Sequence, residues 1–285
     1  MKLIKSKIQL DISPKNPIIK DFLDNIPIIK AKRLLKMWSK LDFYSIKYQS
    51  KDTVVDGYIV KPKIIQSDLP CIIYNRGGSK GFGILDEKIV ASRLGEYASW
   101  GYVVVASQLR GHSGNSYIDE FGGEDLHDIL VLKDILKEIK GCNAKNISMI
   151  GGSRGGMMTL LSLTKLDDLR SVIIEAAPTD IENSYKLRPQ LKEFRRDMYD
   201  VDSIDENRKR SAIYFASKIS KNTPILILHG RQDKSVDIID TYKLAIELQI
   251  NNIPHEIHTF IDADHMLKVP QKWDFKENWL KKYSK

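Results

Sequence analysis

The chain has 285 residues, of which 42% are apolar, and a formal net charge of +8 at pH 7. With this length and apolar content the chain can bury one large core, and a single α/β domain of this size is common. Two cysteines, Cys71 and Cys142, are too few for a disulfide framework, and no Cys/His cluster has metal-ligand spacing. We expect a cytoplasmic protein with no leader peptide, no stable membrane insertion and no bound metal.

Most of the positive charge lies at the start of the chain. Residues 1–40 contain ten Lys/Arg against three Asp, a net charge of +7. Residues 27–41 have helical periodicity, with basic residues on one face. The apolar face comprises Ile28, Ala31, Leu34, Leu35, Trp38 and Leu41. Such a helix could meet anionic lipid or nucleic acid, but charge runs usually serve solvation. We therefore expect residues 1–41 to be a basic helical arm docked on the main domain, with no nucleic-acid partner.

The remaining residues, 42–285, are expected to form one α/β domain. Residues 43–49 and 54–61 alternate like an antiparallel pair of strands. From residue 70 on, buried strands alternate with helices, which indicates a mostly parallel sheet covered on both faces. The expected strands are 71–74, 102–106, 147–150, 172–176, 225–229 and 255–260, and the expected helices are 87–99, 125–139, 155–164, 238–250 and 272–282.

Residues 180–222 interrupt this alternation with ten Lys/Arg and eight Asp/Glu. Because the insertion follows the carboxyl end of a strand, we expect a helical cap over the active site. Its net charge of +2 favours no acidic substrate. Apolar residues at helical spacing either roof the substrate pocket or seat the cap, and we assign Phe194 to the pocket. These residues are Leu187, Leu191, Phe194, Met198 and Tyr199.

The motif Gly151-Gly152-Ser153-Arg154-Gly155 lies between an expected strand and an expected helix. A serine on such a turn has strained backbone, and its hydroxyl is exposed at the carboxyl edge of the sheet. A phosphate-binding loop would need lysine and a hydroxyl where Met157 and Met158 stand, and the glycine spacing does not fit a dinucleotide fingerprint. We interpret Ser153 as a nucleophile.

Two residues that could complete a catalytic triad follow later strands. Asp233 follows strand 225–229, and His265 follows strand 255–260. Ligands of open parallel sheets bind beyond the carboxyl ends of the strands. The chain order Ser153, Asp233, His265 is that of a hydrolase triad. Each residue alone has an ordinary alternative: a turn serine, a helix-capping aspartate or a loop histidine.

The other histidines fit the role of catalytic base less well. His229 ends a strand, and we expect it to brace the acid loop. His112 lies in a glycine-rich loop and is assigned to the substrate pocket together with Arg76. His255 and His258 are expected on opposite faces of one strand, so they cannot share a metal.

Two backbone amides must meet the oxyanion that forms during acyl transfer. One is the amide of Arg154, the residue after the nucleophile. The other is expected from the Gly77-Gly78 loop, because paired glycines let the main chain approach a substrate closely. An ordinary glycine turn is the alternative reading of this loop.

Several motifs occur together in a fixed order along the chain. They are Asn75-Arg76-Gly77-Gly78, Arg110-Gly111-His112-Ser113-Gly114, Glu120-Phe121-Gly122-Gly123-Glu124-Asp125, Gly151-Gly152-Ser153-Arg154-Gly155-Gly156, Leu228-His229-Gly230-Arg231-Gln232-Asp233 and Asp264-His265. From about Tyr44 to its last residue, the chain resembles the catalytic domain of the prolyl oligopeptidase family. The resemblance implies an α/β-hydrolase fold, the triad Ser153, Asp233 and His265, and the oxyanion hole described above.

Two features depart from the family pattern. The large members carry a β-propeller that admits only short peptides, whereas some forty residues precede the hydrolase-like part here. Arg76 also stands where many relatives have histidine. Selection of peptides by size is therefore not implied.

We expect a serine hydrolase that acts through an acyl-enzyme and needs no cofactor. Its substrates are expected to be short peptides and amides or short acyl esters, with esters cleaved faster because an alkoxide leaves more easily than an amine. A carboxylesterase-like enzyme and a non-catalytic binding protein on the same fold are the alternatives. An aminopeptidase would need carboxylates to hold the substrate amine. The candidates are Glu120, Glu124, Asp125 and Glu182, of which Glu124 and Asp125 fit first-turn helix charges equally well.

Overall fold

The alternating residues after position 40 fold into a long antiparallel hairpin. In the computed structural model, which describes residues 2–112 and 117–284, strand β2 (Leu41–Ser50) pairs along its length with β3 (Thr53–Pro62). Gly57 lets the next strand, β5 (Val103–Ser107), approach, because a Cβ at this position would lie 2.6 Å from the carbonyl oxygen of Ala106.

The chain divides into two compact units, and one strand belongs to both. The first unit comprises residues 1–74, 84–117 and 127–147, and the second comprises residues 75–83, 118–126 and 148–285. In the first unit the strands follow the order β1-β2-β3-β5-β4-β6, and in the second the order β6-β7-β8-β9. The second set pairs in parallel, as expected. The strands not yet bounded are β1 (Ile4–Gln9), β4 (Leu69–Asn75), β6 (Cys142–Gly152), β7 (Ser171–Glu175), β8 (Ile225–Gly230) and β9 (His255–Phe260).

Two helices predicted from sequence are interrupted. Residues 87–99 contain a π-helical turn between two short α-helices, and residues 125–139 break near Val131. The helices that begin in the first unit, together with α5 at its border, are α1 (Pro17–Asp24), α2 (Ile28–Trp38), α3 (Glu87–Ile89), η1 (Val90–Leu94), α4 (Gly95–Ser99), α5 (Leu126–Leu130) and α6 (Leu132–Lys137).

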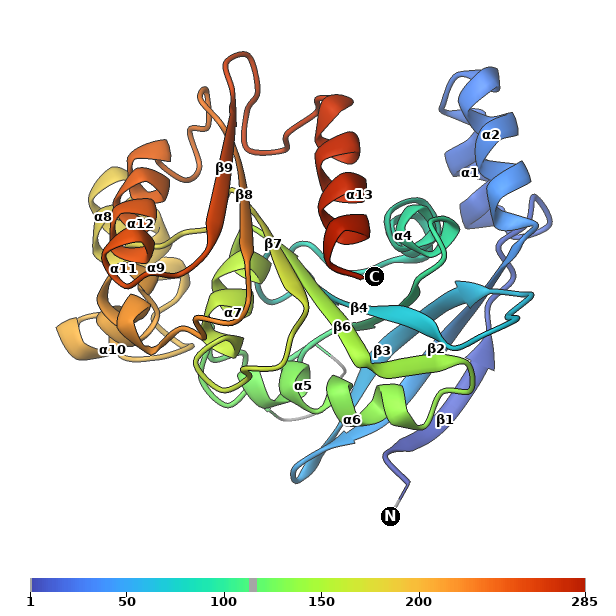
Figure 1. Ribbon diagram of the computed structural model, residues 1–285, viewed down its shortest axis with the longest axis horizontal. Helices are drawn as coiled ribbons and strands as arrows, with labels where there is room; N and C mark the ends of the chain where they lie inside the picture. Colours follow the sequence, from blue (N-terminus) through green and yellow to red (C-terminus); the bar gives the residue numbers. More distant parts are fainter. Residues whose placement is uncertain (1, 113–116, 285) are drawn as a thin grey trace. The chain divides into compact units, whose positions relative to one another are not determined.

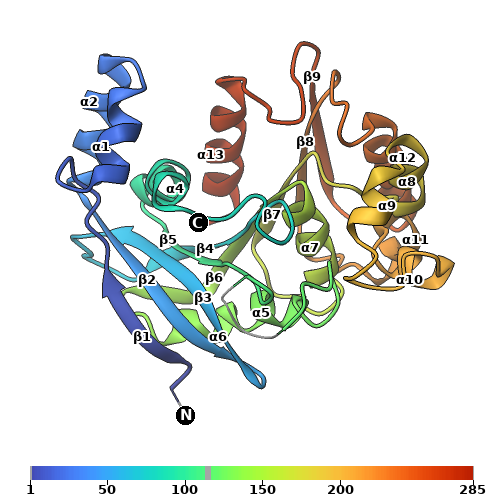
Figure 2. The ribbon, with the colours of Figure 1, turned by 180° about the vertical axis from the view of Figure 1, so that it is seen from behind.

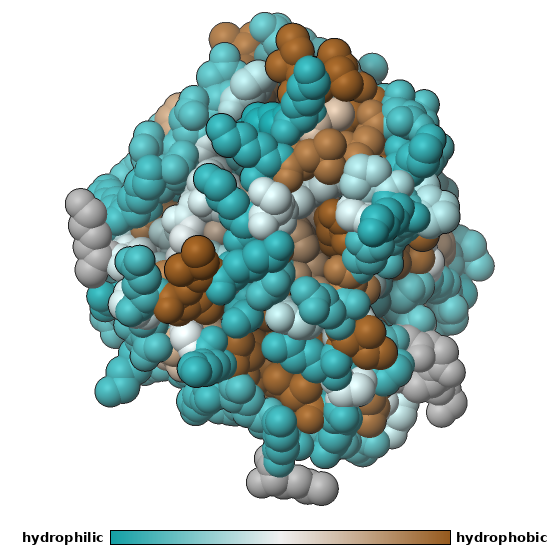
Figure 3. Space-filling view, turned by 90° about the vertical axis from the view of Figure 1, so that its right-hand side faces the viewer, coloured by the Kyte–Doolittle hydropathy of each residue, from teal (hydrophilic) through white to brown (hydrophobic). Residues whose placement is uncertain are grey.

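Residues 1–41 contain β1, α1 and α2, of which only α2 was predicted (Figure 2). The buried face of α2 includes Ala31, Leu34 and Trp38, whereas Ile28 is 68% exposed. The prediction is therefore wrong for Ile28, which lies at the first turn, while the other end of the helix is anchored by the hydrogen bond from Trp38 Nε1 to the Ala91 carbonyl (2.9 Å). The surface in Figure 3 is largely hydrophilic with separate apolar groups. The division into an arm and a hydrolase domain stays a prediction.

In the second unit, helices cover both faces of the parallel strands. Helix α12 (Ile238–Ile250) packs on β8 and β9, and α13 (Gln271–Tyr283) packs on β7. Figure 1 shows these two helices on opposite sides of the strands. Helix α7 (Arg154–Ser162) follows β6 and is buried along its whole length. No helix of the described residues is long and apolar enough to cross a membrane.

The segment between β7 and β8 is helical, as predicted, and its role as a cap stays a prediction. Its elements are α8 (Ile181–Leu187), α9 (Gln190–Phe194), α10 (Ile204–Lys209), α11 (Ala212–Phe215) and η2 (Ala216–Lys218). The predicted single apolar face does not exist, because Pro189 separates α8 from α9. Met198 is buried, whereas Leu187 is 55% and Phe194 43% exposed.

Candidate active site

Ser153 occupies the sharp turn between β6 and α7. Its φ of 53° and ψ of −125° are strained for a residue with a side chain. Two flanking glycines are sterically required, since a Cβ on Gly151 would lie 2.1 Å from the Gly155 carbonyl oxygen, and one on Gly155 would lie 2.1 Å from that of Asn75. Close packing of α7 against β6 and against the end of β4 therefore explains the two glycines and leaves Ser153 half-buried at the strand end.

The structure brings the three predicted triad residues together. His265 Nε2 lies 3.1 Å from Ser153 Oγ, and His265 Nδ1 lies 2.7 Å from Asp233 Oδ2. Because the carboxylate can only accept, Nδ1 carries the proton and the neutral ring accepts from the serine hydroxyl at Nε2. The three side chains thus have the connections of a nucleophile, a base and an orienting acid.

Asp233 is held as a carboxylate by several donors. Its Oδ1 accepts the backbone N–H groups of Ser235 (2.7 Å) and Val236 (2.9 Å). Burial alone would raise the pKa of Asp233, but hydrogen bonds from His229, His265 and the Val236 backbone outweigh burial and lower the pKa below its usual range. The acid therefore remains ionised wherever the neutral His265 can act as a base.

His229 braces this carboxylate, as predicted. It is fully buried, and its Nε2 lies 3.1 Å from Asp233 Oδ2 and 3.2 Å from the Val236 carbonyl oxygen. Since both neighbours accept, Nε2 carries the proton, and Nδ1 accepts from the Thr241 hydroxyl at 2.6 Å. His229 is thus an orienting residue for the acid and has no contact with Ser153 among the described hydrogen bonds.

The glycine loop after β4 packs against the nucleophile. A Cβ on Gly77 would lie 3.5 Å from Ser153 Cβ, so the backbone of Gly77 lies close to the serine. Gly78 has a φ of +71°, and a Cβ there would clash with the Phe82 carbonyl oxygen at 2.2 Å. Arg154 is the first residue of α7, and the helix itself does not use the first N–H groups. The two predicted sources of oxyanion amides therefore flank Ser153.

A buried ion cluster beneath this loop was not predicted. The Arg154 guanidinium pairs with Asp119 at 2.6 Å and with Asp125, and it donates to the Gly78 carbonyl oxygen at 3.1 Å. All three charged residues are at most 4% exposed. The residue after the nucleophile therefore also fixes the second oxyanion loop. In the sequence, this cluster could have been recognised from Asp119 and Asp125 on either side of Gly122-Gly123 and from the arginine directly after the nucleophile.

This cluster corrects one of the candidate amine-binding acids, Asp125, and the assignment of the others stays a prediction. Asp125 is fully buried and committed to Arg154, so it cannot hold a substrate amine. Glu120 accepts the backbone N–H of Glu124 at 2.8 Å, which is a local turn contact. Glu182 lies in the first turn of α8.

The structure places the three predicted pocket residues, Arg76, His112 and Phe194, in different surroundings. The Arg76 side chain is 1% exposed and donates to the carbonyl oxygens of Gly77 (3.2 Å) and Phe82 (3.0 Å), so it supports the loop from inside, which corrects its assignment to the pocket wall. Burial and the neighbouring Arg154 lower the pKa of Arg76 to about 10. Phe194 is exposed on the cap and lies beneath Lys80 Nζ, 4.6 Å from the ring centroid.

His112 belongs to the first unit, whereas the triad belongs to the second. It lines a cavity of about 210 Å³ with residues of β1, β2 and β3. Ser113 and Gly114, from the same predicted motif, lie outside the described residues. The assignment of His112 to the substrate pocket therefore stays a prediction.

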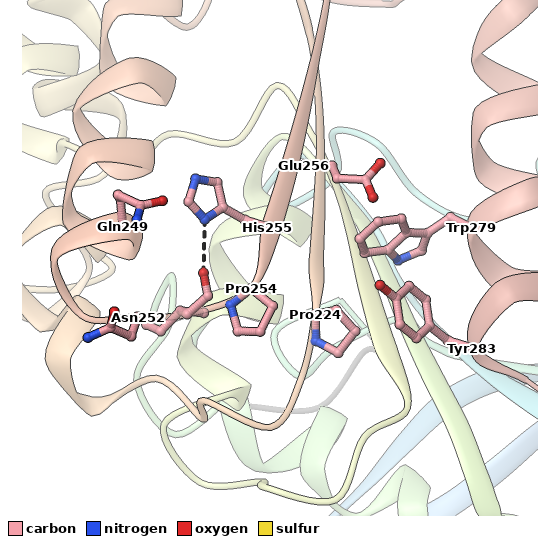
Figure 4. A pocket seen from close by; sticks show the side chains of 9 residues that line it. Pro224, Gln249, Asn252, Pro254, His255, Glu256, Trp279 and Tyr283 are labelled. Carbon is pink, nitrogen blue, oxygen red and sulfur yellow. Dashed lines mark hydrogen bonds between the residues drawn. The ribbon is translucent and has the colours of Figure 1, made fainter.

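A cavity of about 400 Å³ lies at the other edge of the second unit's sheet. Pro224 and Pro254, which immediately precede β8 and β9, form part of its wall, and Trp279 and Tyr283 come from α13 (Figure 4). The triad loops follow the carboxyl ends of the same strands, so this cavity is separate from the catalytic groups. No cluster of His, Cys, Asp and Glu in the described part of the chain could hold a metal ion.

A strained serine after a strand, a histidine within hydrogen-bond reach and a buried acid define a serine hydrolase of the α/β-hydrolase fold. Comparison with known families matches residues 90–285 to the prolyl oligopeptidase family. This match covers more than half of the chain. The chain therefore belongs to the prolyl oligopeptidase family, a family of serine peptidases.

Individual relatives are distant in sequence. The uncharacterized peptidase YtmA of Bacillus subtilis is 26% identical over 84% of this chain and 91% of its own length. An acylaminoacyl peptidase of Pyrococcus horikoshii superposes with a TM-score of 0.76 at 22% identity, over 89% of this chain and 44% of that one. An acetyl xylan esterase from Paenibacillus sp. R4 superposes with a TM-score of 0.66 at 17% identity, over 94% and 95%.

Several curated relatives are much longer than this chain. The chain spans about a third or less of several other curated relatives. At such identities the solved structures establish the fold alone. The substrate therefore has to be argued from the site itself.

Proposed function

We propose that this protein hydrolyses acyl bonds of small esters and short peptides through an acyl-enzyme formed on Ser153. The observation that carries the proposal is the continuous hydrogen-bond path from Ser153 Oγ through His265 to Asp233, at 3.1 and 2.7 Å. His265 takes the serine proton during attack and returns it to the leaving group, while Asp233 orients the ring and stabilises its charged form. The amides of Arg154 and the Gly77-Gly78 loop receive the developing oxyanion.

Esters are the better substrates in this proposal. An alkoxide or phenoxide leaves with less help from the general acid than an amine does. Of the acids predicted to hold a free substrate amine, Asp125 is engaged with Arg154, and Glu120 accepts a hydrogen bond within its own turn. This favours the carboxylesterase-like alternative over an aminopeptidase. The absence of a nucleic-acid partner and the cytoplasmic location stay predictions from the sequence.

Labelling and turnover test this function together. A fluorophosphonate probe is expected to label the wild-type protein and not Ser153→Ala. One sample is then assayed against p-nitrophenyl esters of increasing acyl length and against aminoacyl p-nitroanilides. We expect ester turnover with a burst of p-nitrophenol, reduced by several orders of magnitude in Ser153→Ala and His265→Ala. Equal labelling of wild type and Ser153→Ala would refute the assignment and favour a binding role.

A further inference from the structure

Arg195 is a buried cation without a matching acid. It directly follows α9 in the cap and is 7% exposed. Its guanidinium carbon lies 3.8 Å from the ring centroid of Phe121 and 5.6 Å from that of Tyr185. One guanidinium nitrogen, Nη1, is buried and has no hydrogen-bond partner. Because a guanidinium remains charged at neutral pH, this arrangement is unfavourable unless an acceptor joins it.

Two other buried arginines of the same unit pair with acids, and a third, Arg76, donates to the backbone carbonyl oxygens of Gly77 and Phe82. Arg154 pairs with Asp119 and Asp125, and Arg210 pairs with Glu206 at 2.7 Å. Among the residues that the structure describes, no carboxylate forms an ion pair with Arg195, and burial lowers its pKa. Its polar neighbours are the hydroxyls of Tyr185 and Tyr199, and the guanidinium is hydrogen-bonded to that of Tyr185. Arg195 therefore differs from these arginines, and an external anion bound beside it would neutralise its buried charge.

Arg195 is linked through one aromatic ring, Phe121, to the side chain of the residue that follows the nucleophile. The Phe121 ring beneath it is 5.2 Å from the guanidinium carbon of Arg154, the neighbour of Ser153. On the adjacent side, Lys80 Nζ donates to the Phe194 carbonyl oxygen at 3.0 Å and pairs with Asp197 at 2.8 Å. Lys80 follows the Gly77-Gly78 loop. The end of α9 therefore contacts both loops that carry or support the oxyanion amides.

We propose that Arg195 determines specificity by binding a carboxylate of the substrate beside the acyl bond that Ser153 attacks. This proposal rests on the proposed function. A carboxylate matches the planar guanidinium, which presents two parallel N–H groups. The rings of Phe121 and Tyr185 hold the guanidinium and exclude water, which strengthens its attraction for an anion. The carboxylate can belong to the acyl part, as in a dicarboxylic monoester, or to the leaving part, as in the last residue of a short peptide.

Two pairs of matched substrates distinguish these sources. Mono-p-nitrophenyl adipate and p-nitrophenyl hexanoate differ by an acyl-side carboxylate. Similarly, 4-acetoxybenzoate and its methyl ester differ by a carboxylate on the leaving group. We expect the wild-type kcat/KM to favour the charged member of one pair by about tenfold or more. In Arg195→Gln that ratio should fall toward one, and Arg195→Lys should restore part of it because the charge remains.

The adjacent residue provides the matched control. Arg196→Gln removes the same charge, but Arg196 is 51% exposed and pairs with Asp202 and Glu193, so the ratio should not change. Fluorophosphonate titration normalises each rate to active Ser153. If the Arg195 variants do not fold, inhibition of the wild-type protein tests the site directly. Free adipate and the uncharged adipamide are then compared as inhibitors of p-nitrophenyl hexanoate hydrolysis.

Equal inhibition by adipate and adipamide, or a charged-to-neutral ratio that survives in Arg195→Gln, would overturn the proposal. A wild-type ratio near one in both pairs would do the same. Absence of Ser153-dependent hydrolysis of all four substrates would instead remove the proposed function, and the Arg195 proposal with it.

Discussion

At the scale of single residues, the orientation of the catalytic acid depends on a second histidine. The Nε2–H of His229 and the Nδ1–H of His265 converge on the same oxygen, Oδ2 of Asp233. Oδ1 is occupied by two backbone donors. Removal of any one donor leaves the others in place, so the carboxylate should stay ionised but turn more freely.

For His229→Leu we therefore expect kcat to fall about 10- to 100-fold, corresponding to one lost hydrogen bond to a charged acceptor, with KM changed less than about threefold. His229→Gln, whose amide can still donate to Asp233, should keep most of the activity. Steady-state kinetics with one p-nitrophenyl ester measure both variants, and circular dichroism checks that they fold. A kcat of His229→Leu equal to that of the wild type would show that Asp233 does not need the hydrogen bond from His229.

The ion cluster of Arg154 gives a prediction about stability. Asp119→Asn leaves a buried guanidinium short of one partner, so we expect the free energy of unfolding to fall by about 3–5 kcal/mol. Asp197→Asn breaks the exposed pair with Lys80, where the aspartate is 67% exposed, and should cost at most about 1 kcal/mol. Urea denaturation of the full chain compares the two. Similar losses for both variants would mean that burial of the cluster is energetically unimportant.

At the scale of elements, the contact between α8 and α12 should respond to pH. Burial, and to a smaller extent the charge of Asp180, raises the pKa of Asp240 to about 6. The hydrogen bond from Asn183 Nδ2 to Asp240 Oδ1 (2.7 Å) acts in the opposite direction but is the weaker effect. A carboxyl with a raised pKa binds its proton more tightly in the folded state than in the unfolded state. Stability should therefore fall as the pH rises from about 4 to above 6.

In Asp240→Asn this pH-dependent loss should disappear. At pH 7 the variant should equal or exceed the wild type in unfolding free energy by on the order of 1 kcal/mol, because Lys243, 3.6 Å from Asp240 Oδ1, offsets part of the cost of the buried charge. Thermal melting at several pH values between 4 and 8 provides the measurement. Parallel pH profiles for the variant and the wild type would contradict the assignment of this titration to Asp240.

At the scale of the whole molecule, residues 1–40 are integral to the first unit. Strand β1 pairs with β2, and the backbone N–H groups of Leu3 and Ile4 donate to Glu138 at 2.5 and 3.1 Å. Ile19, Leu34 and Trp38 are buried. Removal of the segment would expose this apolar surface and leave β2 as a long unpaired edge, which favours aggregation.

We therefore expect a chain of residues 41–285 to be largely insoluble or to melt well below the full chain. Reversal of two exposed charges on α2, in the double variant Lys30→Glu/Lys32→Glu, should preserve solubility and melting temperature, because both side chains are exposed to solvent. Expression yield and thermal melting compare the three proteins. A soluble truncated chain with an unchanged melting temperature would support a peripheral arm.

The sequence by itself determined the local elements and the order of the catalytic groups. Periodicity is a local property, and it placed α12 at residues 238–250 and β9 at residues 255–260, where the structure has them. The glycine at position 151 is also explained locally, by steric contact between β6 and α7, whereas Gly155 is required by its contact with Asn75 of β4. Parallel strands bring their carboxyl ends to one edge, so the chain order of Ser153, Asp233 and His265 sufficed to predict their meeting.

Only the tertiary structure decided which charges are buried and what neutralises them. Asp119 and Asp125 lie 35 and 29 residues before their partner Arg154, and no local pattern distinguishes a buried aspartate from one in the first turn of a helix. The same holds for β1, whose pairing with β2 depends on residues far along the chain. Arg195 and Arg196 are neighbours in sequence, yet one is buried without an acid and the other is exposed and paired. Net charge is a sum over the chain, whereas desolvation depends on where each charge lies, and that is fixed by packing.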